Sequence, residues 1–168
     1  MSYSAAIARP SSIRHFLLGK VALPSVLIYR KLFKRHKIAW NVNRQKLGTY
    51  DDGSIGKSLS NFLYQNEIDI EDKMENHDFF HVVLDYGTSL PEEAAIHFFL
   101  IGNGKKSHYP IIAAFVGFLF FPEHLDLYID AYHRGRKSKH FVGFALKSFL
   151  HVPVGTFKET FQIPERSF

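Results

Sequence analysis

The sequence contains no cysteine, and this absence excludes two kinds of site. No disulfide can cross-link the fold, and no thiolate can bind a metal. Any metal site in this chain must therefore use nitrogen and oxygen ligands.

Long apolar runs are missing as well. The longest, residues 111–121, has eleven residues and would rise only about 17 Å as a helix, well short of the roughly 30 Å hydrocarbon layer of a membrane. Lys20 interrupts the apolar run near the start, so the sequence lacks the uninterrupted core of a secretory signal. We therefore expect neither a membrane-spanning helix nor a secretory signal.

Acidic residues are absent from the first 50 positions, which hold ten of the 21 Lys and Arg. The rest of the chain carries eleven cations against sixteen acids, so a basic arm precedes a mildly acidic body. Over residues 24–37 a helical wheel separates an apolar arc from a cationic one. This pattern is typical of a helix on an anionic membrane surface, and a helix packed on the body is the alternative. No nucleic-acid-binding motif accompanies the charge, so we expect no nucleic-acid partner.

Apolar residues are plentiful, since 46% of the chain is hydrophobic and 25 residues are Phe or Tyr. Helical spacing and capping residues predict helices over 55–66, 70–85, 89–102, 110–121, 123–139, 141–150 and 156–161. Residues 115–121 alone also fit a buried strand. Without a hairpin signal or an internal repeat, we expect an all-α domain of about six to eight helices over residues 47–168. The basic arm, with its amphipathic helix, covers residues 1–46.

A polar stripe in the otherwise apolar helix over 70–85 is the strongest functional signal. His77, His81 and Asp85 repeat at i, i+4 and i+8, and Asp78 lies about 100° round the helix from His77. The neighbouring Phe, Val and Leu residues indicate a buried helix, in which an unpaired polar group costs several kcal/mol. A divalent metal is the simplest shared partner for these side chains.

Glu93 follows His81 after eleven residues and falls in the first turn of the next predicted helix. Because the connection is short, we expect the two helices to be antiparallel neighbours with facing polar sides. Two imidazoles with one or two carboxylates suit zinc, iron, manganese or cobalt, and three ligands leave a position for water or substrate. Asp78 is either a ligand or the acceptor of a histidine N–H. Structural or surface histidines are the alternative.

His77-Asp78-x-x-His81 with Glu93 resembles the metal-ligand motif of the Coq four family of ubiquinone (coenzyme Q) biosynthesis proteins. Gly53-Ser54-Ile55-Gly56 and His151-Val-Pro-Val resemble segments on either side of that motif, so the similarity runs from about Leu47 to Ile163. It implies a helical protein that binds a divalent metal, most commonly zinc, and prenyl lipids. The ligands it implies are His77, Asp78, His81 and Glu93.

Two positions depart from the family pattern. Glu92 stands where a glycine normally precedes the ligand glutamate, and His97 stands at the position of a lysine. A carboxylate and an imidazole so close to the site could change the metal preference or add a ligand. Beyond the metal site no motif fixes a catalytic residue, and these two are the nearest candidates.

A prenylated ring needs an apolar groove and a cationic contact for its polar end. Phe side chains of the helices over 89–102 and 110–121 could line the groove, and an arginine near the end of the helix over 123–139 could supply the charge. Plain core packing and a solvated helix end are the alternatives. The candidate lipid-binding residues are Phe98, Phe115, Phe118, Phe121 and Arg134.

The resemblance implies a role in ubiquinone or prenylquinone biosynthesis, inside the cell and peripheral at the inner face of a membrane. Family members are described as enzymes that remove a ring carboxyl group, with hydroxylation at that carbon, and as organisers of the quinone-biosynthesis enzymes. We expect a metal-dependent oxidative decarboxylase of a prenylated aromatic acid; a non-catalytic lipid-binding scaffold is the alternative. The implied partners are a prenylated quinone precursor or another isoprenoid lipid, the membrane surface and other quinone-biosynthesis proteins, and a homodimer is compatible with them.

A His-Asp metal phosphohydrolase is a remote alternative, because the His-Asp doublet also occurs in that class. It needs a separate upstream histidine and a downstream aspartate, for which His36 and Asp126 or Asp130 are the candidates. This reading leaves Glu93 without a role.

Overall fold

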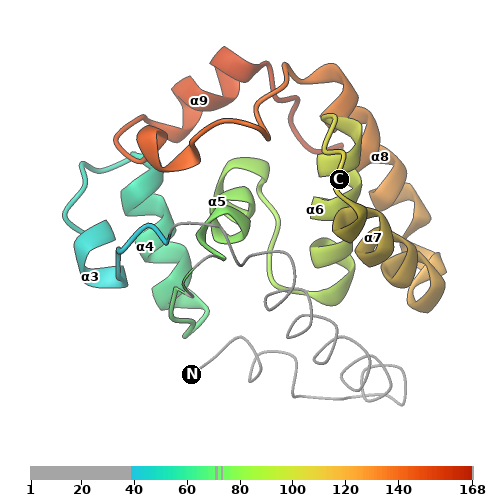
Figure 1. Ribbon diagram of the computed structural model, residues 1–168, viewed down its shortest axis with the longest axis horizontal. Helices are drawn as coiled ribbons and strands as arrows, with labels where there is room; N and C mark the ends of the chain where they lie inside the picture. The colour runs from blue at the N-terminus through green and yellow to red at the C-terminus, as the bar shows by residue number, and fades with distance from the viewer. Residues whose placement is uncertain (1–38, 71, 73, 168) are drawn as a thin grey trace.

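The computed structural model describes residues 39–70, 72 and 74–167, so the amphipathic segment expected over residues 24–37 lies outside the described residues. The described part contains seven α-helices, two 3-10 turns and no strand (Figure 1). The expected all-α fold is confirmed.

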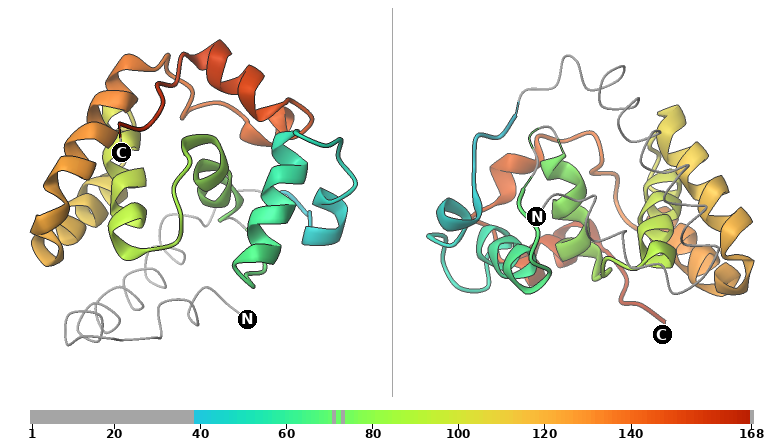
Figure 2. Two further views of the ribbon diagram at one scale, coloured as in Figure 1. Left: turned by 180° about the vertical axis from the view of Figure 1, so that it is seen from behind. Right: turned by 90° about the horizontal axis from the view of Figure 1, so that it is seen from below.

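The buried helix that carries both histidines lies at the centre of the arrangement. Helix α5 has α4 on one side and α6, α7 and α8 on the other, and α9 passes across one end (Figures 1 and 2). The α-helices are α3 (Arg44–Leu47), α4 (Ile55–Gln65), α5 (Glu75–Leu84), α6 (Leu90–Gly102), α7 (His108–Phe120), α8 (Leu125–Lys137) and α9 (Val154–Phe161). The 3-10 turns are η1 (Pro122–His124) and η2 (Leu146–Phe149).

Local capping signals place two helices where the sequence predicts them. Helix α4 begins after Ser54, whose hydroxyl oxygen accepts a hydrogen bond of 3.2 Å from the Lys57 N–H. Helix α6 begins after Ser89 with a proline in its first turn and ends at Gly102. The start of α6 matters for the site, because Glu93 lies in that first turn.

Two predicted helices differ from the structure. Helix α5 begins at Glu75, with Met74 as its N-cap, and not at residue 70; the carboxylate of Asp69, the expected cap, pairs with Arg44 at 2.7 Å. The segment 141–150 is not an α-helix but a turn followed by η2. Its first residue, Phe141, donates its N–H to the Asn103 side chain, so long-range contacts satisfy the backbone there.

The core extends into the segment assigned to the basic arm. Trp40 is buried, donates its N–H to Glu75 at 2.7 Å and packs edge-on against Phe79 of α5. Around Phe141 a cluster of phenylalanine rings joins α5, α6 and α9. These contacts surround α5 on several sides, so its polar side chains lie inside the protein.

Helices α6 and α8 cross at glycines. A β-carbon built on Gly135 would lie 2.2 Å from the carbonyl oxygen of Phe99, and one on Gly102 would lie 2.2 Å from that of Tyr132. Neither oxygen belongs to a flexible side chain. The close approach of the two backbones therefore depends on the absence of side chains at both positions.

We expect Gly135→Ala to lower the free energy of unfolding by about 1–3 kcal/mol, because the added methyl group forces the two helices apart. Urea denaturation measures this change. The matched control is Gly155→Ala on α9, where a β-carbon has no heavy atom within 4 Å, and it should stay within about 0.5 kcal/mol of the parent. Equal stability of the two variants would contradict the close crossing.

Candidate metal centre

Helices α5 and α6 bring two histidines and one glutamate together. His77 and His81 are one turn apart on α5, and Glu93 lies in the first turn of α6. One ligand atom from each side chain lies within 4.8 Å of the others. The structure thus gathers three of the side chains that the polar stripe and the connection to α6 pointed to.

Short contacts connect all three side chains. His77 Nε2 lies 2.8 Å from one carboxylate oxygen of Glu93, and His81 Nε2 lies 3.3 Å from the other. The two Nε2 atoms are 3.2 Å apart. The His81 side chain has no exposed surface, while 13% of the His77 side chain and 22% of the Glu93 side chain remain exposed. The cluster is therefore mostly buried, with part of the His77 and Glu93 side chains exposed.

The connection between the two helices orients His81. Asp85 has left-handed backbone angles and ends α5, and the next carbonyl, that of Tyr86, lies 3.1 Å from His81 Nδ1. A carbonyl oxygen can only accept, so this contact favours a proton on Nδ1 and leaves the lone pair on Nε2. This is the arrangement in which a ligating histidine presents its other nitrogen to a metal.

Opposite charges shift the pKa values inside the cluster. Burial alone would raise the pKa of Glu93, but His81 and His77 outweigh it and hold that pKa far below the usual range. Burial alone would lower the pKa of His81, but the Glu93 carboxylate outweighs it and the net pKa is raised. Burial and then His77 lower the pKa of His97 to about 3, so His97 is a neutral imidazole at pH 7. An ionised carboxylate between imidazoles is a suitable donor set for a dication.

The donor set fits a divalent metal. Two imidazoles and a carboxylate hold catalytic zinc in some hydrolases and non-haem iron in some oxygenases, each with open positions. All three side chains supply nitrogen or oxygen ligands, as a metal site in a protein without cysteine must. These residues can therefore hold zinc, iron, manganese or cobalt.

Two acidic candidates lie beside the group of three but outside it. Asp78 on α5 is fully buried, and its charge helps to raise the pKa of His81. The Glu92 carboxylate accepts hydrogen bonds from Ser89 at 2.8 Å and from Arg166 at 3.1 Å. Glu92 is thus engaged with the start of α6 and the C-terminal segment. The assignment of Asp78 as a ligand stays a prediction.

The candidate lipid-binding residues occupy different environments. Phe115 and Phe118 lie at the surface of α7, and Phe98 stacks on Tyr128 at 4.8 Å. Phe121 is buried in the core. Arg134 is also buried and donates to the carbonyl oxygens of Leu84 and Pro164 and to the hydroxyl of Tyr86. Their shared role in lipid binding remains a prediction.

Helix α7 exposes a row of large apolar side chains, which we call the α7 face. At least half of the surface of each of its four most exposed members is accessible, and Phe115 reaches 62%. Among the described residues, no single helix is long and apolar enough to cross a membrane. Helix α7 and its bent continuation through η1 and α8 have the required length and apolar character only when they are taken together. The α7 face consists of Ile111, Ile112, Phe115, Phe118 and Leu119.

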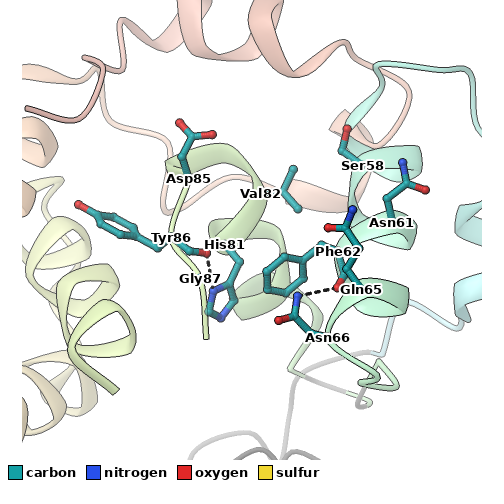
Figure 3. Close-up of a pocket in the computed structure, with 10 residues that line it drawn as sticks. All are labelled: Ser58, Asn61, Phe62, Gln65, Asn66, His81, Val82, Asp85, Tyr86 and Gly87. Atoms are coloured by element: carbon teal, nitrogen blue, oxygen red, sulfur yellow. Dashed lines mark hydrogen bonds between the residues drawn. The ribbon is translucent and has the colours of Figure 1, made fainter. Parts of the chain in front are cut away.

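Residues of α4, α5 and the connection to α6 line an open pocket of about 470 Å³ beside His81 (Figure 3). Phe62 of α4 stacks on the His81 ring at 4.9 Å, and Asn61, Gln65 and Asn66 line the pocket around it. Sequence reasoning missed these amide side chains, because polar residues at helical spacing look like an ordinary solvated helix face. The His81 side chain has no exposed surface, so the pocket lies next to this histidine without opening onto it.

Comparison with known proteins shows a similar fold in a solved structure. The sequence matches no protein-family model and no curated protein. The fold is similar to the crystal structure of a "putative ubiquinone biosynthesis protein" from Nostoc punctiforme, with a TM-score of 0.64 and 15% sequence identity over 97% of this chain and 94% of that one. At this identity, the likeness shows that the two chains share a fold.

Proposed function

We propose that this chain is a divalent-metal protein of ubiquinone or prenylquinone biosynthesis that binds a prenylated aromatic ring precursor at a membrane surface. The observation that carries the proposal is the convergence of His77, His81 and Glu93 on one point between α5 and α6. The shared fold with a protein described as belonging to ubiquinone biosynthesis supports the pathway. The His77-Asp78-x-x-His81 motif with Glu93 contains the same three residues, and it supports both the metal site and the pathway.

The reaction we favour is oxidative removal of a ring carboxyl group with hydroxylation at that carbon. The bond from the ring to the carboxyl carbon breaks and carbon dioxide leaves, a hydroxyl group from water takes its place, and an external oxidant such as dioxygen accepts the two electrons released. A bound metal, with zinc the first choice and iron, manganese or cobalt the others, would supply Lewis acidity for an anionic ring substituent. The chain's own residues orient and insulate this centre. Tyr86 fixes the His81 ring through its carbonyl oxygen, Phe62 covers one face of that ring, and the two imidazoles keep Glu93 ionised.

The proposed membrane contact has two parts. The α7 face offers apolar side chains that can enter the boundary of a lipid layer, as interfacial helices do. The Lys and Arg residues of the segment 24–37 offer attraction to anionic headgroups. We place the protein inside the cell, peripheral at the inner face of a membrane.

A non-catalytic scaffold is the second candidate, and the α7 face is the observation that favours it. An exposed apolar surface of this kind suits a protein partner such as another quinone-biosynthesis enzyme as well as it suits lipid. In a scaffold the metal would be structural. The phosphohydrolase reading gains no support, since Asp126 and Asp130 lie on α8 and neither belongs to the group of three.

The metal site is tested by elemental analysis of the full chain together with Glu93→Gln and His81→Ala. We expect about one divalent ion per parent chain and a loss of at least roughly 10-fold in metal affinity in each variant, because removing a ligand should cost no less than removing an outer-shell partner. Glu159→Gln and His151→Ala, at exposed positions, are the matched controls and should retain the metal. A parent chain that binds no divalent ion would refute the proposal.

The two candidate functions separate in the same variants. For an enzyme, Glu93→Gln should abolish turnover of a prenylated hydroxybenzoate while the far-UV circular dichroism and the melting temperature change little. For a scaffold, the parent shows no turnover, and loss of metal lowers the melting temperature or releases protein partners.

The membrane contact is tested with Ile112→Glu combined with Phe115→Glu. Sedimentation with phosphatidylcholine vesicles that contain phosphatidylglycerol should show binding weakened by at least about 10-fold, because burying a large apolar side chain is worth roughly 1.5–3 kcal/mol. The control is Tyr64→Glu, an equally drastic change at a half-exposed position on α4. Unchanged binding of the double variant would remove the α7 face from the contact.

A further inference from the structure

His97 is a buried imidazole of α6 with an unsatisfied nitrogen. Only 7% of the residue is exposed, and its Nδ1 has no hydrogen-bond partner among the described residues. Leaving a buried polar atom unpaired is costly, so such atoms are rare and usually mark a missing partner. A ligand that the protein binds is one such partner.

The position of His97 points to the metal centre. His97 follows Glu93 by four residues, so the two side chains project from the same side of α6, one turn apart. On the facing helix, His77 and His81 have the same spacing. Each helix therefore contributes one pair of metal-binding residue types at i and i+4, as in metal sites between the helices of bundles.

Ring contacts place His97 beside the group of three. Its ring stacks on that of His77 with centroids 5.9 Å apart and an interplanar angle of 24°. On another side Tyr109 of α7 packs edge-on at 5.3 Å. The nitrogens of His97 are not among the atoms that lie within 4.8 Å of one another. The His97 side chain must therefore rotate about its own bonds before it can bind the same metal ion as His77.

Simple packing does not account for this residue. A phenylalanine would stack on His77 and meet Tyr109 without leaving a buried nitrogen unpaired. A purely supporting role would need a hydrogen bond from His97 to one of the three side chains, and the described residues include none. What an imidazole adds here is a nitrogen donor from α6, beside the oxygen donor of Glu93.

We propose that His97 is a fourth protein ligand, which makes the centre a site of three histidines and one glutamate. The inference rests on the metal proposed above and extends its ligand set. It has a chemical consequence, since four protein ligands fill the coordination sphere of tetrahedral zinc and close it to substrate. Iron, manganese or cobalt, which accept five or six ligands, would keep positions open in the same site. With this ligand set, one of these three metals and not zinc would therefore serve the Lewis-acid role proposed above.

The first test counts coordinated imidazoles in the unaltered full-length protein. Long-range proton–nitrogen NMR spectra of the histidine rings are recorded before and after one equivalent of Zn²⁺, and His97→Gln assigns the His97 signals. We expect ring nitrogens of three histidines, His77, His81 and His97, to shift as their lone pairs are bound. Shifts confined to His77 and His81 would overturn the inference and leave the three-ligand site intact.

The second test uses His97→Phe, which keeps a ring against His77 and Tyr109 but removes both nitrogens. We expect Zn²⁺ and Co²⁺ affinities to fall by at least about 10-fold, and the visible spectrum of the Co²⁺ form to change with its ligand set. The matched control is His108→Ala, which removes an exposed histidine at the start of α7 and should bind as the parent does. Parent-like affinity and spectrum in His97→Phe would overturn the inference.

Failure of the inference and failure of the proposed function are distinguishable. If the parent binds no metal, both fall. If the parent binds metal and Glu93→Gln loses it while His97→Phe keeps it, only the fourth ligand falls. If His97→Phe does not fold by circular dichroism, the NMR count on the parent decides the matter.

Discussion

The geometry of the candidate metal centre depends on a buried guanidinium, that of Arg134, which contacts the side chain of Tyr86. Arg134 of α8 donates to the carbonyl oxygen of Leu84, where α5 ends, and to the Tyr86 hydroxyl at 2.9 Å. The same residue that offers its side chain to Arg134 offers its backbone carbonyl to His81. Arg166 also contacts the connection between α5 and α6: it pairs with Glu92, and its guanidinium lies over the Tyr86 ring. Because the turn between α5 and α6 is fixed from α8 and from the C-terminal segment, the distance from His81 to Glu93 is fixed as well.

The sequence signals that predict the group of His77, His81 and Glu93 are all local. The spacing of His77 and His81 is set by the helix itself, and the apolar residues around them indicate that the helix is buried. Ser89 and Pro91 place Glu93 in the first turn of α6. Because the connection from α5 is short, that turn is expected to face α5. These three facts need no knowledge of the rest of the chain. For this reason the group of three could be anticipated and the fold class with it.

What the sequence could not supply depends on partners far along the chain. Asp69 is a residue type that often caps helices, but its carboxylate pairs with Arg44, and α5 starts later than its own residues suggest. Arg134 looks like a solvated cation at a helix end and is in fact surrounded by acceptors from α5 and the C-terminal segment. Phe141 heads a stretch with helical spacing, yet the Asn103 side chain accepts its N–H. In each case a long-range contact outweighs the local preference.

Helix α6 connects the two features that a membrane-bound substrate would need. One side of it carries Glu93 and His97, and the next residue after Glu93, Ala94, meets α7 so closely that a β-carbon on Gly117 would lie 2.3 Å from its own. Helix α7, which carries the exposed apolar side chains, therefore packs directly on the helix that carries Glu93 and His97. The open pocket lined by α4 lies beside His81 on another side of the same group of three. Under the function proposed above, the α7 face would meet the prenyl tail of the substrate, and the polar side chains of α4 would lie on the side of its charged ring.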